Sequence, residues 1–304
     1  MKKNVAKAPS RHPRLARFLR RLRLVLFLVL FLGLAFGLGG ILLFHRYERS
    51  FLYRPSPDVT ANPYAVDLVH QNVTFRADDG TQLHGWWIPA SYPVANLVIF
   101  HGNAGNISYN LKLLPFFHAR RYNVFLFDYR GYGQSEGTPT ESGLYLDAKA
   151  AIDVALKMNK FARPRLPLLL YGHSLGVPVC LHAALESPVP PVALILDSGF
   201  HSATNMAHLL FPRLPLAHLL TAHFPAGDYA SRLPDIPKLF LHSPADTTVP
   251  FASGRLLAEA AAPPKQFALL NGAHSDYAWL QTNSPAHAAL DAFLRAAISP
   301  APAP

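Results

Sequence analysis

Short runs of apolar residues recur along the chain, separated by turn residues and by stretches with helical spacing. The run VTFRA (73–77) and the run QLHGWWIP (82–89) flank the turn residues DDG and predict an antiparallel hairpin. Later runs have the length of strands that are buried on both faces of a parallel sheet. They are NLVIF (96–100), NVFLF (123–127), PLLLY (167–171), VALIL (192–196), KLFLH (238–242) and QFALL (266–270).

Helical patterns lie between these runs. Residues 140–157 carry apolar side chains at helical spacing, and Thr140 can cap the helix at its start. Ser284 followed by Pro285 predicts the start of the last helix. An antiparallel hairpin followed by alternating strands and helices predicts an α/β fold, a doubly wound and mostly parallel sheet with helices on both faces.

The longest apolar run, residues 24–44, has 21 residues and no charge. At about 1.5 Å per helical residue, that length crosses the hydrocarbon core of a bilayer. The run is also longer than the roughly 7–15 residues of a signal-peptide core. We interpret it as an uncleaved transmembrane anchor, with a cleaved signal peptide as the alternative.

The net charge of +10 is concentrated at the N-terminus. Residues 1–23 contain nine of the 28 basic residues and no acid, so the remaining 19 basic residues nearly balance the 18 acidic ones. A nucleic-acid-binding domain carries its positive charge on a folded surface, and this chain does not. A basic flank instead predicts a cytoplasmic N-terminal tail, with the rest of the chain on the periplasmic or other extracytoplasmic side.

Three further segments follow the anchor. Residues 45–68 are rich in proline and predict an irregular tether, residues 69–298 suit a single α/β domain, and residues 299–304 form a short tail. The lone cysteine, Cys180, excludes an intrachain disulfide and is expected to be a buried packing thiol. No HExxH or CxxC motif occurs, so we expect neither a metal site nor a cofactor.

Two segments match the pattern G-x-S-x-G, which in a nucleophile elbow places a serine between a strand and a helix. Residues 172–176 (GHSLG) follow the apolar run PLLLY and precede a helical stretch, as an elbow requires. Residues 133–137 (GQSEG) lie in a loop with no helix at their end. The sequence therefore predicts Ser174 as the nucleophile and Ser135 as part of a structural loop.

The loop HGNAGN (101–106) follows the first parallel strand. Backbone N–H groups in such a loop can stabilise the oxyanion that develops during acyl transfer. We expect the donors to be the N–H of Asn103 and the N–H of Leu175, which follows the nucleophile. An ordinary glycine- and asparagine-rich turn is the alternative.

The acid and the histidine of a serine hydrolase of this kind follow the serine in that order. Asp246 lies in a loop after the run KLFLH, and His274 follows the last predicted strand. Both therefore belong to the carboxyl edge of the sheet, where sites form in α/β folds. Asp197 is the alternative acid, and Asp128 is expected to pair with Arg130.

Residues 198–235 are too long for a simple connection between a strand and a helix, and we interpret them as a small helical cap. Most of its large apolar residues are expected to pack on the sheet, although an apolar cap beside a membrane favours acyl-chain substrates. These residues are Leu209, Leu210, Phe211, Leu216, Leu219, Leu220 and Phe224.

Five motifs together resemble the α/β-hydrolase superfamily, and most resemble its membrane-anchored branch of lysophospholipase- and serine-aminopeptidase-like proteins. The motifs, in the expected order over residues 70–298, are HGNAGN, FDYRGYGQSEG, GHSLG, HSPADTTVP and GAHSD. The chain departs from the family in Pro178, where a small helix former is usual, and in HSPAD, where HGxxD is commoner. Neither departure removes a catalytic group.

The resemblance implies a serine hydrolase of the carboxylesterase or lipase type, acting on a small-molecule or lipid ester or thioester. Ser174, Asp246 and His274 would form its triad, and Asn103 and Leu175 its oxyanion hole. A catalytically silent binding protein on the same fold is one alternative, because fold does not dictate function. A peptidase or a cofactor-free haloperoxidase is another, and the oligomeric state is left open.

Overall fold

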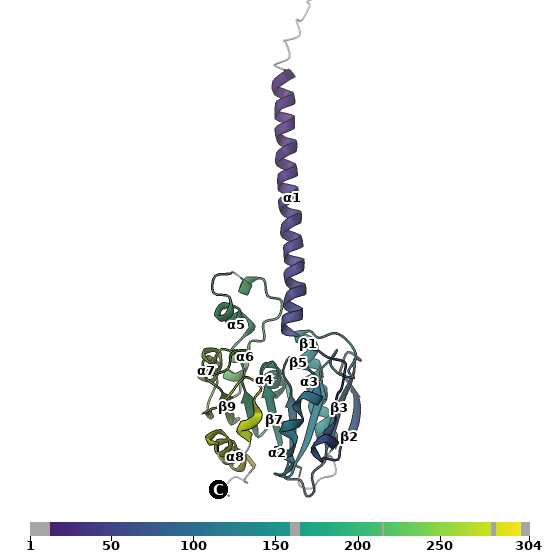
Figure 1. Cartoon of the computed structure of the whole chain (residues 1–304), viewed down its shortest axis with the longest axis vertical. Helices are drawn as coiled ribbons and strands as arrows, with labels where there is room; N and C mark the ends of the chain where they lie inside the picture. Colours follow the sequence, from purple (N-terminus) through teal and green to yellow (C-terminus); the bar gives the residue numbers. More distant parts are fainter. Residues whose placement is uncertain (1–12, 159–164, 215, 281–283, 299–304) are drawn as a thin grey trace, which may run out of the picture. The chain divides into compact units, whose positions relative to one another are not determined.

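The computed structural model describes residues 13–158, 165–214, 216–280 and 284–298. The chain divides into two compact units, residues 1–49 and residues 50–304. Figure 1 traces the elements of both units along the sequence.

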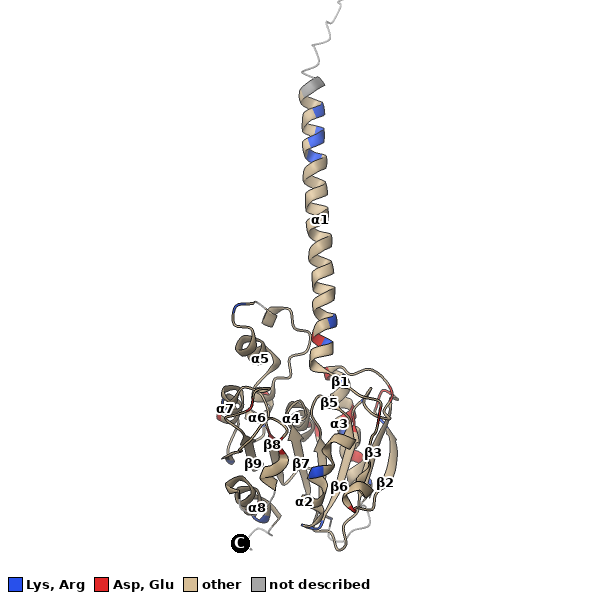
Figure 2. Cartoon of the chain, viewed as in Figure 1, with Lys and Arg blue, Asp and Glu red and all other residues tan. Residues whose placement is uncertain are grey.

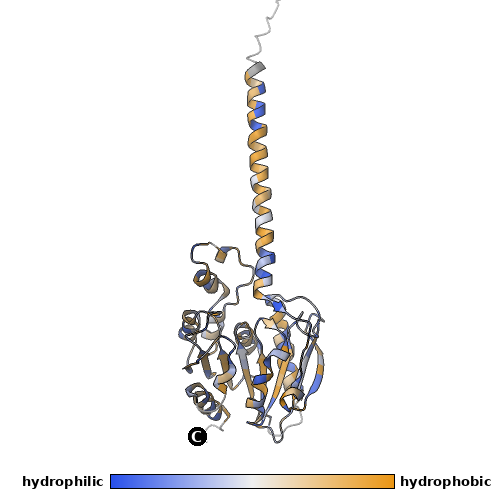
Figure 3. Ribbon diagram, in the orientation of Figure 1, coloured by the Kyte–Doolittle hydropathy of each residue, from blue (hydrophilic) through white to orange (hydrophobic). Residues whose placement is uncertain are grey.

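The first unit contains helix α1 (Pro13–Leu52), whose last three residues belong to the second unit. Its large apolar side chains are exposed on all sides, and within residues 15–52 it is long and apolar enough to cross a membrane. Positive charges gather at its start, and its middle is uncharged and apolar (Figures 2 and 3). A helix that is apolar all round suits lipid better than water. The structure thus contains the single candidate span that the sequence predicts within the described residues.

The second unit is built on an eight-stranded sheet with the order β10-β9-β8-β7-β4-β6-β3-β2. Strands β10 to β6 in this order run parallel, and β3 and β2 are antiparallel, which confirms the predicted sheet and its hairpin. The strands are β2 (Gln71–Arg76), β3 (Gln82–Ile88), β4 (Ala95–Phe100), β6 (Tyr122–Asp128), β7 (Leu168–His173), β8 (Ala193–Asp197), β9 (Lys238–His242) and β10 (Lys265–Leu269).

Helices cover both faces of this sheet. Side chains of α3, α4, α6 and α7 join one apolar cluster, and side chains of α2 and α8 join the other. All residues of the central strands β4, β6 and β7 are buried between the two layers, which explains their continuous apolar runs. The helices are α2 (Leu114–His118), α3 (Glu141–Met158), α4 (Gly176–Glu186), α5 (Ala203–Leu210), α6 (Ala226–Ser231), α7 (Phe251–Ala260) and α8 (Pro285–Ile298).

Four short 3-10 helices complete the described elements, and the predicted caps are present. The Gly143 N–H donates to Thr140 Oγ1 at 3.1 Å, and the His287 N–H donates to Ser284 Oγ at 3.0 Å. The 3-10 helices are η1 (Pro63–Val66), η2 (Ile107–Leu113), η3 (Leu216–His218) and η4 (Tyr277–Leu280).

The structure corrects the prediction that residues 45–68 form an irregular tether. Helix α1 continues to Leu52, because no glycine or proline interrupts residues 45–52. The following residue, Tyr53, is buried in the domain core, as is Leu68. Between them the short strand β1 (Arg54–Pro55) pairs with β5 (Ala104–Gly105). The segment after the helix is therefore part of the domain.

The segment predicted as a cap contains α5, η3 and α6, inserted between β8 and β9. Its apolar residues do not pack as expected. Of the seven large ones, Phe224 is buried, whereas Leu209 and Leu219 are exposed and the other four are half-buried.

Candidate active site

The segment around Ser174 has the geometry of a nucleophile elbow. Ser174 lies between the end of β7 and the start of α4 and has a φ of 54°, which non-glycine residues rarely adopt. The two flanking glycines permit this tight turn. A Cβ on Gly176 would lie 2.0 Å from the Phe100 carbonyl oxygen, and a Cβ on Gly172 would lie 2.7 Å from the Gly176 carbonyl oxygen.

Ser174 is hydrogen-bonded to His274, and His274 to Asp246. The distance from Ser174 Oγ to His274 Nε2 is 2.8 Å, and that from His274 Nδ1 to Asp246 Oδ2 is 2.6 Å. Ser174 and Asp246 are buried, and the His274 side chain is 13% exposed. The sheet brings together three side chains from loops after β7, β9 and β10, which the sequence analysis had selected separately.

Several groups besides His274 contact the Asp246 carboxylate. Its Oδ1 accepts the N–H groups of Thr248 at 2.8 Å and Val249 at 2.9 Å, and His242 Nε2 lies 3.4 Å from its Oδ2. Burial raises the pKa of Asp246, but the hydrogen bonds from His242 and His274 and the charge of His274 lower it more. The net effect is a pKa well below the ordinary value, so Asp246 is ionised at neutral pH.

Asp197, the alternative acid, has other partners. Its Oδ2 accepts the Tyr171 hydroxyl at 2.5 Å, and its Oδ1 accepts the Ser198 hydroxyl at 2.9 Å. It also lies 3.6 Å from the Nδ1 of His173, the residue before Ser174. Asp197 thus lies beside His173, and Asp246 is the carboxylate bonded to His274.

His173 is a neighbour of the site that the sequence analysis missed. Its Nε2 lies 3.3 Å from Ser275 Oγ, and its ring centroid is 5.1 Å from that of His274. It therefore connects the elbow to the loop that carries His274. His242 was missed as well. Both histidines are the last residues of strands, and their partners become known only once the neighbouring strands and loops are placed.

The loop after β4 lies beside the elbow because β4 and β7 are neighbouring strands. The Asn103 carbonyl accepts the Arg54 N–H and the Tyr132 hydroxyl, both at 2.9 Å, which fixes this loop. The side-chain amide of Asn103 donates to the Phe51 carbonyl at 3.4 Å. Leu175 takes the N-terminal cap position of α4. The two predicted oxyanion donors therefore belong to the loops that follow two adjacent strands.

The second G-x-S-x-G segment has a structural role. The Ser135 hydroxyl is buried, donates to the Asp128 carbonyl at 2.8 Å and accepts the His84 N–H at 2.9 Å. These bonds tie the loop after β6 to the hairpin strand β3. Ser135 has no hydrogen bond to a histidine side chain among the described contacts.

The predicted pairing of Asp128 with Arg130 is wrong. Arg130 makes a bidentate pair with Asp147 and a further bond to Asp79 at 2.7 Å. Asp128 is buried, accepts the Ile107 N–H at 2.9 Å, and has a pKa that burial raises to about 7. Asp128 is the last residue of β6, whereas Arg130 lies in the turn that follows, so the two side chains have different partners distant in sequence.

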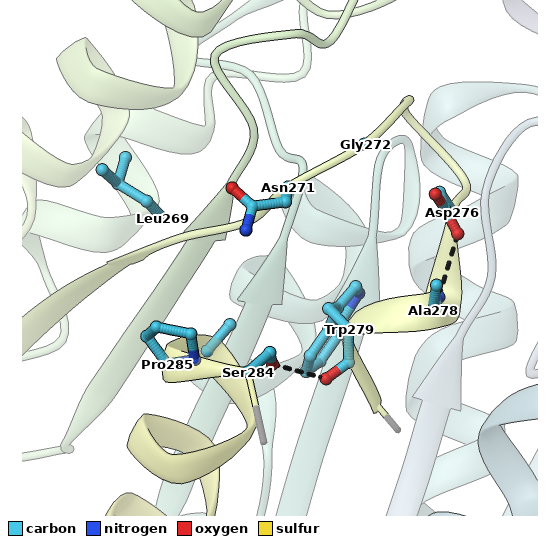
Figure 4. Close-up of a pocket in the computed structure, with 9 residues that line it drawn as sticks. Leu269, Asn271, Gly272, Asp276, Ala278, Trp279, Ser284 and Pro285 are labelled. Carbon is cyan, nitrogen blue, oxygen red and sulfur yellow. Dashed lines mark hydrogen bonds between the residues drawn. The ribbon is translucent and has the colours of Figure 1, made fainter. Parts of the chain in front are cut away.

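Other features of the domain lie apart from this arrangement. Cys180 is buried as predicted, and burial raises its pKa. No cluster of three or more His, Cys, Asp and Glu side chains suits a metal ion within the described part of the chain. A surface hollow adjoins the loop of His274 (Figure 4). It is lined by Asn271, Gly272 and Trp279 but not by Ser174, so we do not assign the substrate to it.

Comparison with known families matches residues 95–302 to the alpha/beta hydrolase fold family. The chain belongs to this family. The family match covers more than half of the chain.

This α/β-hydrolase has relatives in bacteria and fungi. The uncharacterized protein YfhR of Escherichia coli K12 is 34% identical over 239 residues, which cover 76% of this chain and 81% of YfhR. Protein bem46 of Schizosaccharomyces pombe is 27% identical over 72% of this chain and 76% of its own length. The family match establishes the superfamily, and these relatives do not select the lysophospholipase- or aminopeptidase-like branch.

Solved structures show the same fold. The esterase Pf2001 of Pyrococcus furiosus superposes with a TM-score of 0.63 and covers 81% of this chain and 97% of its own. Its sequence identity of 18% limits the comparison to the fold. The α/β-hydrolase fold predicted from the sequence is therefore confirmed.

Proposed function

We propose that this protein is a serine hydrolase that cleaves carboxylic esters or thioesters. The observation that carries the proposal is the continuous hydrogen-bonded chain from Ser174 Oγ through His274 to Asp246. An ionised, buried carboxylate beside a histidine that contacts a serine in a strained turn is the arrangement that activates a hydroxyl nucleophile.

The proposed reaction has two acyl-transfer steps. Ser174 Oγ attacks the substrate carbonyl carbon while its proton passes to His274 Nε2, and Asp246 stabilises the imidazolium. The tetrahedral intermediate collapses, and His274 gives the proton to the departing alcohol or thiol. A water molecule then attacks the acyl-enzyme with His274 as base. The carboxylic acid leaves, and the proton returns to Ser174.

The negative charge of each tetrahedral intermediate requires fixed donors. We assign this role to the backbone N–H groups of Asn103 and Leu175, which follow β4 and the nucleophile. The Asn103 carbonyl and side chain already have protein partners, and these hold its loop in place. One such donor typically contributes roughly 3 kcal/mol to the transition state. The arrangement requires no metal or cofactor.

A panel of substrates tests the proposal and its alternatives. We expect p-nitrophenyl esters and lysolipids to be hydrolysed, consistent with the lysophospholipase-like resemblance, and peptide amides to be poor substrates. Turnover of amides above esters would instead favour the aminopeptidase-like alternative, and halide oxidation would favour the haloperoxidase. If folded protein turned over none of these substrates, the result would favour a catalytically silent binding protein on this fold.

Acidification should abolish ester hydrolysis through a single protonation. Because hydrogen bonds hold the pKa of Asp246 well below its ordinary value, Asp246 stays ionised throughout the mildly acidic range. We therefore expect log(kcat/KM) to fall on the acid side with a slope of about one, because Asp246 adds no protonation of its own. A slope near two while the protein remains folded would contradict this assignment.

We further propose that α1 anchors the enzyme in a membrane with the catalytic domain on the extracytoplasmic side. Nine basic residues precede the apolar run, whereas residues 45–58 after it contain three arginines, one glutamate and one aspartate. In a Gram-negative host, protease added to spheroplasts should digest the domain, and a phosphatase fused at the C-terminus should be active. Protection of the domain in intact spheroplasts would reverse the orientation without affecting the chemistry.

A further inference from the structure

The connection between α5 and α6 exposes apolar side chains. Residues 209–214 and 216–220, from the end of α5 through η3, are here named the cap loop and extend away from the sheet (Figure 1). Leu209, Leu214 and Leu219 are 40%, 53% and 37% exposed. Four further apolar side chains of the cap loop are half-buried; they are Leu210, Phe211, Leu216 and Leu220. Such a cluster of exposed leucines indicates a surface that is covered when the protein functions.

The charge of this region favours an anionic surface as its partner. No aspartate or glutamate occurs from Ser198 to Gly227. Arg213 is exposed within the cap loop, and His208, His218 and His223 are exposed around it. A leucine-rich segment that carries an arginine and no acid suits the head-group layer of a bilayer.

The base of the cap is fixed close to the point where the chain leaves the domain towards α1. The ring of Phe224 contacts that of Tyr53, with centroids 6.4 Å apart. Glu141 of α3 accepts the N–H groups of His223 at 2.7 Å and Phe224 at 2.8 Å, which anchors this base.

The length of the chain keeps Tyr53 near the proposed bilayer. It follows Phe44, the last residue of the apolar run, by nine residues, which span at most about 30 Å when extended. The cap base therefore cannot lie far from the surface of a membrane that α1 crosses.

We propose that the cap loop inserts into the head-group layer of the membrane that α1 spans. This inference rests on the proposed anchoring by α1 but not on the proposed hydrolysis. The cap loop then forms a second contact with lipid, in addition to α1. An ester in the lipid surface reaches the site without crossing bulk water.

Quenching by nitroxide lipids tests the insertion on the full chain. Single cysteines replace Leu214 in the cap loop, Leu32 in the apolar run and Tyr92 in the loop before β4, and each is labelled with an environment-sensitive fluorophore. The native Cys180 is fully buried, and parent protein treated with the same fluorophore controls for its reaction. Tyr92 is a matched control because it is 87% exposed and lies at the opposite edge of the sheet from Ser174.

The variants are reconstituted in vesicles of phosphatidylcholine and phosphatidylglycerol that contain a nitroxide near the glycerol backbone or deep in the acyl chain. We expect the shallow nitroxide to quench the probe at Leu214→Cys and the deep one to quench Leu32→Cys. The probe at Tyr92→Cys should be quenched by neither. Ser174→Ala should leave this pattern unchanged, so failure of the hydrolase proposal is distinguishable.

Three outcomes overturn the inference. In the first, the probe at Leu32→Cys is quenched but the probe at Leu214→Cys is as little quenched as that at Tyr92→Cys. This result would support the anchor and contradict the insertion. A blue-shifted but unquenched probe at Leu214→Cys would indicate that protein, such as a second copy of the chain, covers the cap loop. No quenching at Leu32→Cys would remove the anchor and the insertion together.

Discussion

Replacement of Ser174 with alanine should remove essentially all ester hydrolysis, a loss of about 10⁴-fold or more in kcat. The reason is that Ser174 Oγ is the group hydrogen-bonded to His274 Nε2, and alanine leaves no atom to form the acyl-enzyme. The measurement is kcat for a p-nitrophenyl ester with purified full-length protein. Thermal melting of the variant should remain close to that of the parent, because the change removes one oxygen atom.

Ser135→Ala is the matched control, since it removes the same atom from the second G-x-S-x-G segment. The Ser135 hydroxyl bonds the Asp128 carbonyl and the His84 N–H, so its loss should lower stability by about 1–3 kcal/mol. It should leave kcat nearly unchanged. A folded but inactive Ser135→Ala together with an active Ser174→Ala would reverse the assignment.

Asp246→Asn and His274→Ala should each lower kcat by on the order of 10³–10⁴-fold. Asparagine keeps an oxygen for the N–H groups of Thr248 and Val249 but cannot stabilise an imidazolium. The double variant should be little worse than the single ones, because the groups act as a unit. The measurement is kcat for each single variant and for the pair.

Two results would contradict this account of the pair. Full activity in a folded Asp246→Asn protein would indicate that another carboxylate orients His274, with Asp197 the nearest alternative through His173. Losses that multiply in the double variant would show that Asp246 and His274 act independently.

The sheet could be predicted from the sequence because its signals are local. A central strand such as β4 is buried on both faces and therefore reads as an unbroken apolar run. The order of motifs along the chain then assigns Ser174, Asp246 and His274 to the carboxyl edge of the sheet. Their mutual distances follow from strand order, which a single sequence does not contain.

The parts that could not be predicted depend on contacts between distant segments. Arg130 pairs with Asp147 and Asp79, which lie 17 and 51 residues away, rather than with Asp128. The contact between His242 and Asp246 forms only because the chain turns after β9. The packing of Tyr53 into the domain requires the cap base at Phe224. In each case the local sequence is compatible with several partners, and tertiary packing selects one.

Reaction with a fluorophosphonate probe tests the central claim most directly, because the probe phosphonylates serines that a neighbouring histidine activates. The full-length protein is labelled in mild detergent and digested, and the modified peptide is identified by mass spectrometry. We predict an adduct on Ser174 that is lost in His274→Ala, with Ser135 unmodified. Folded protein that takes no adduct, or that takes it on Ser135, would contradict the proposed hydrolase.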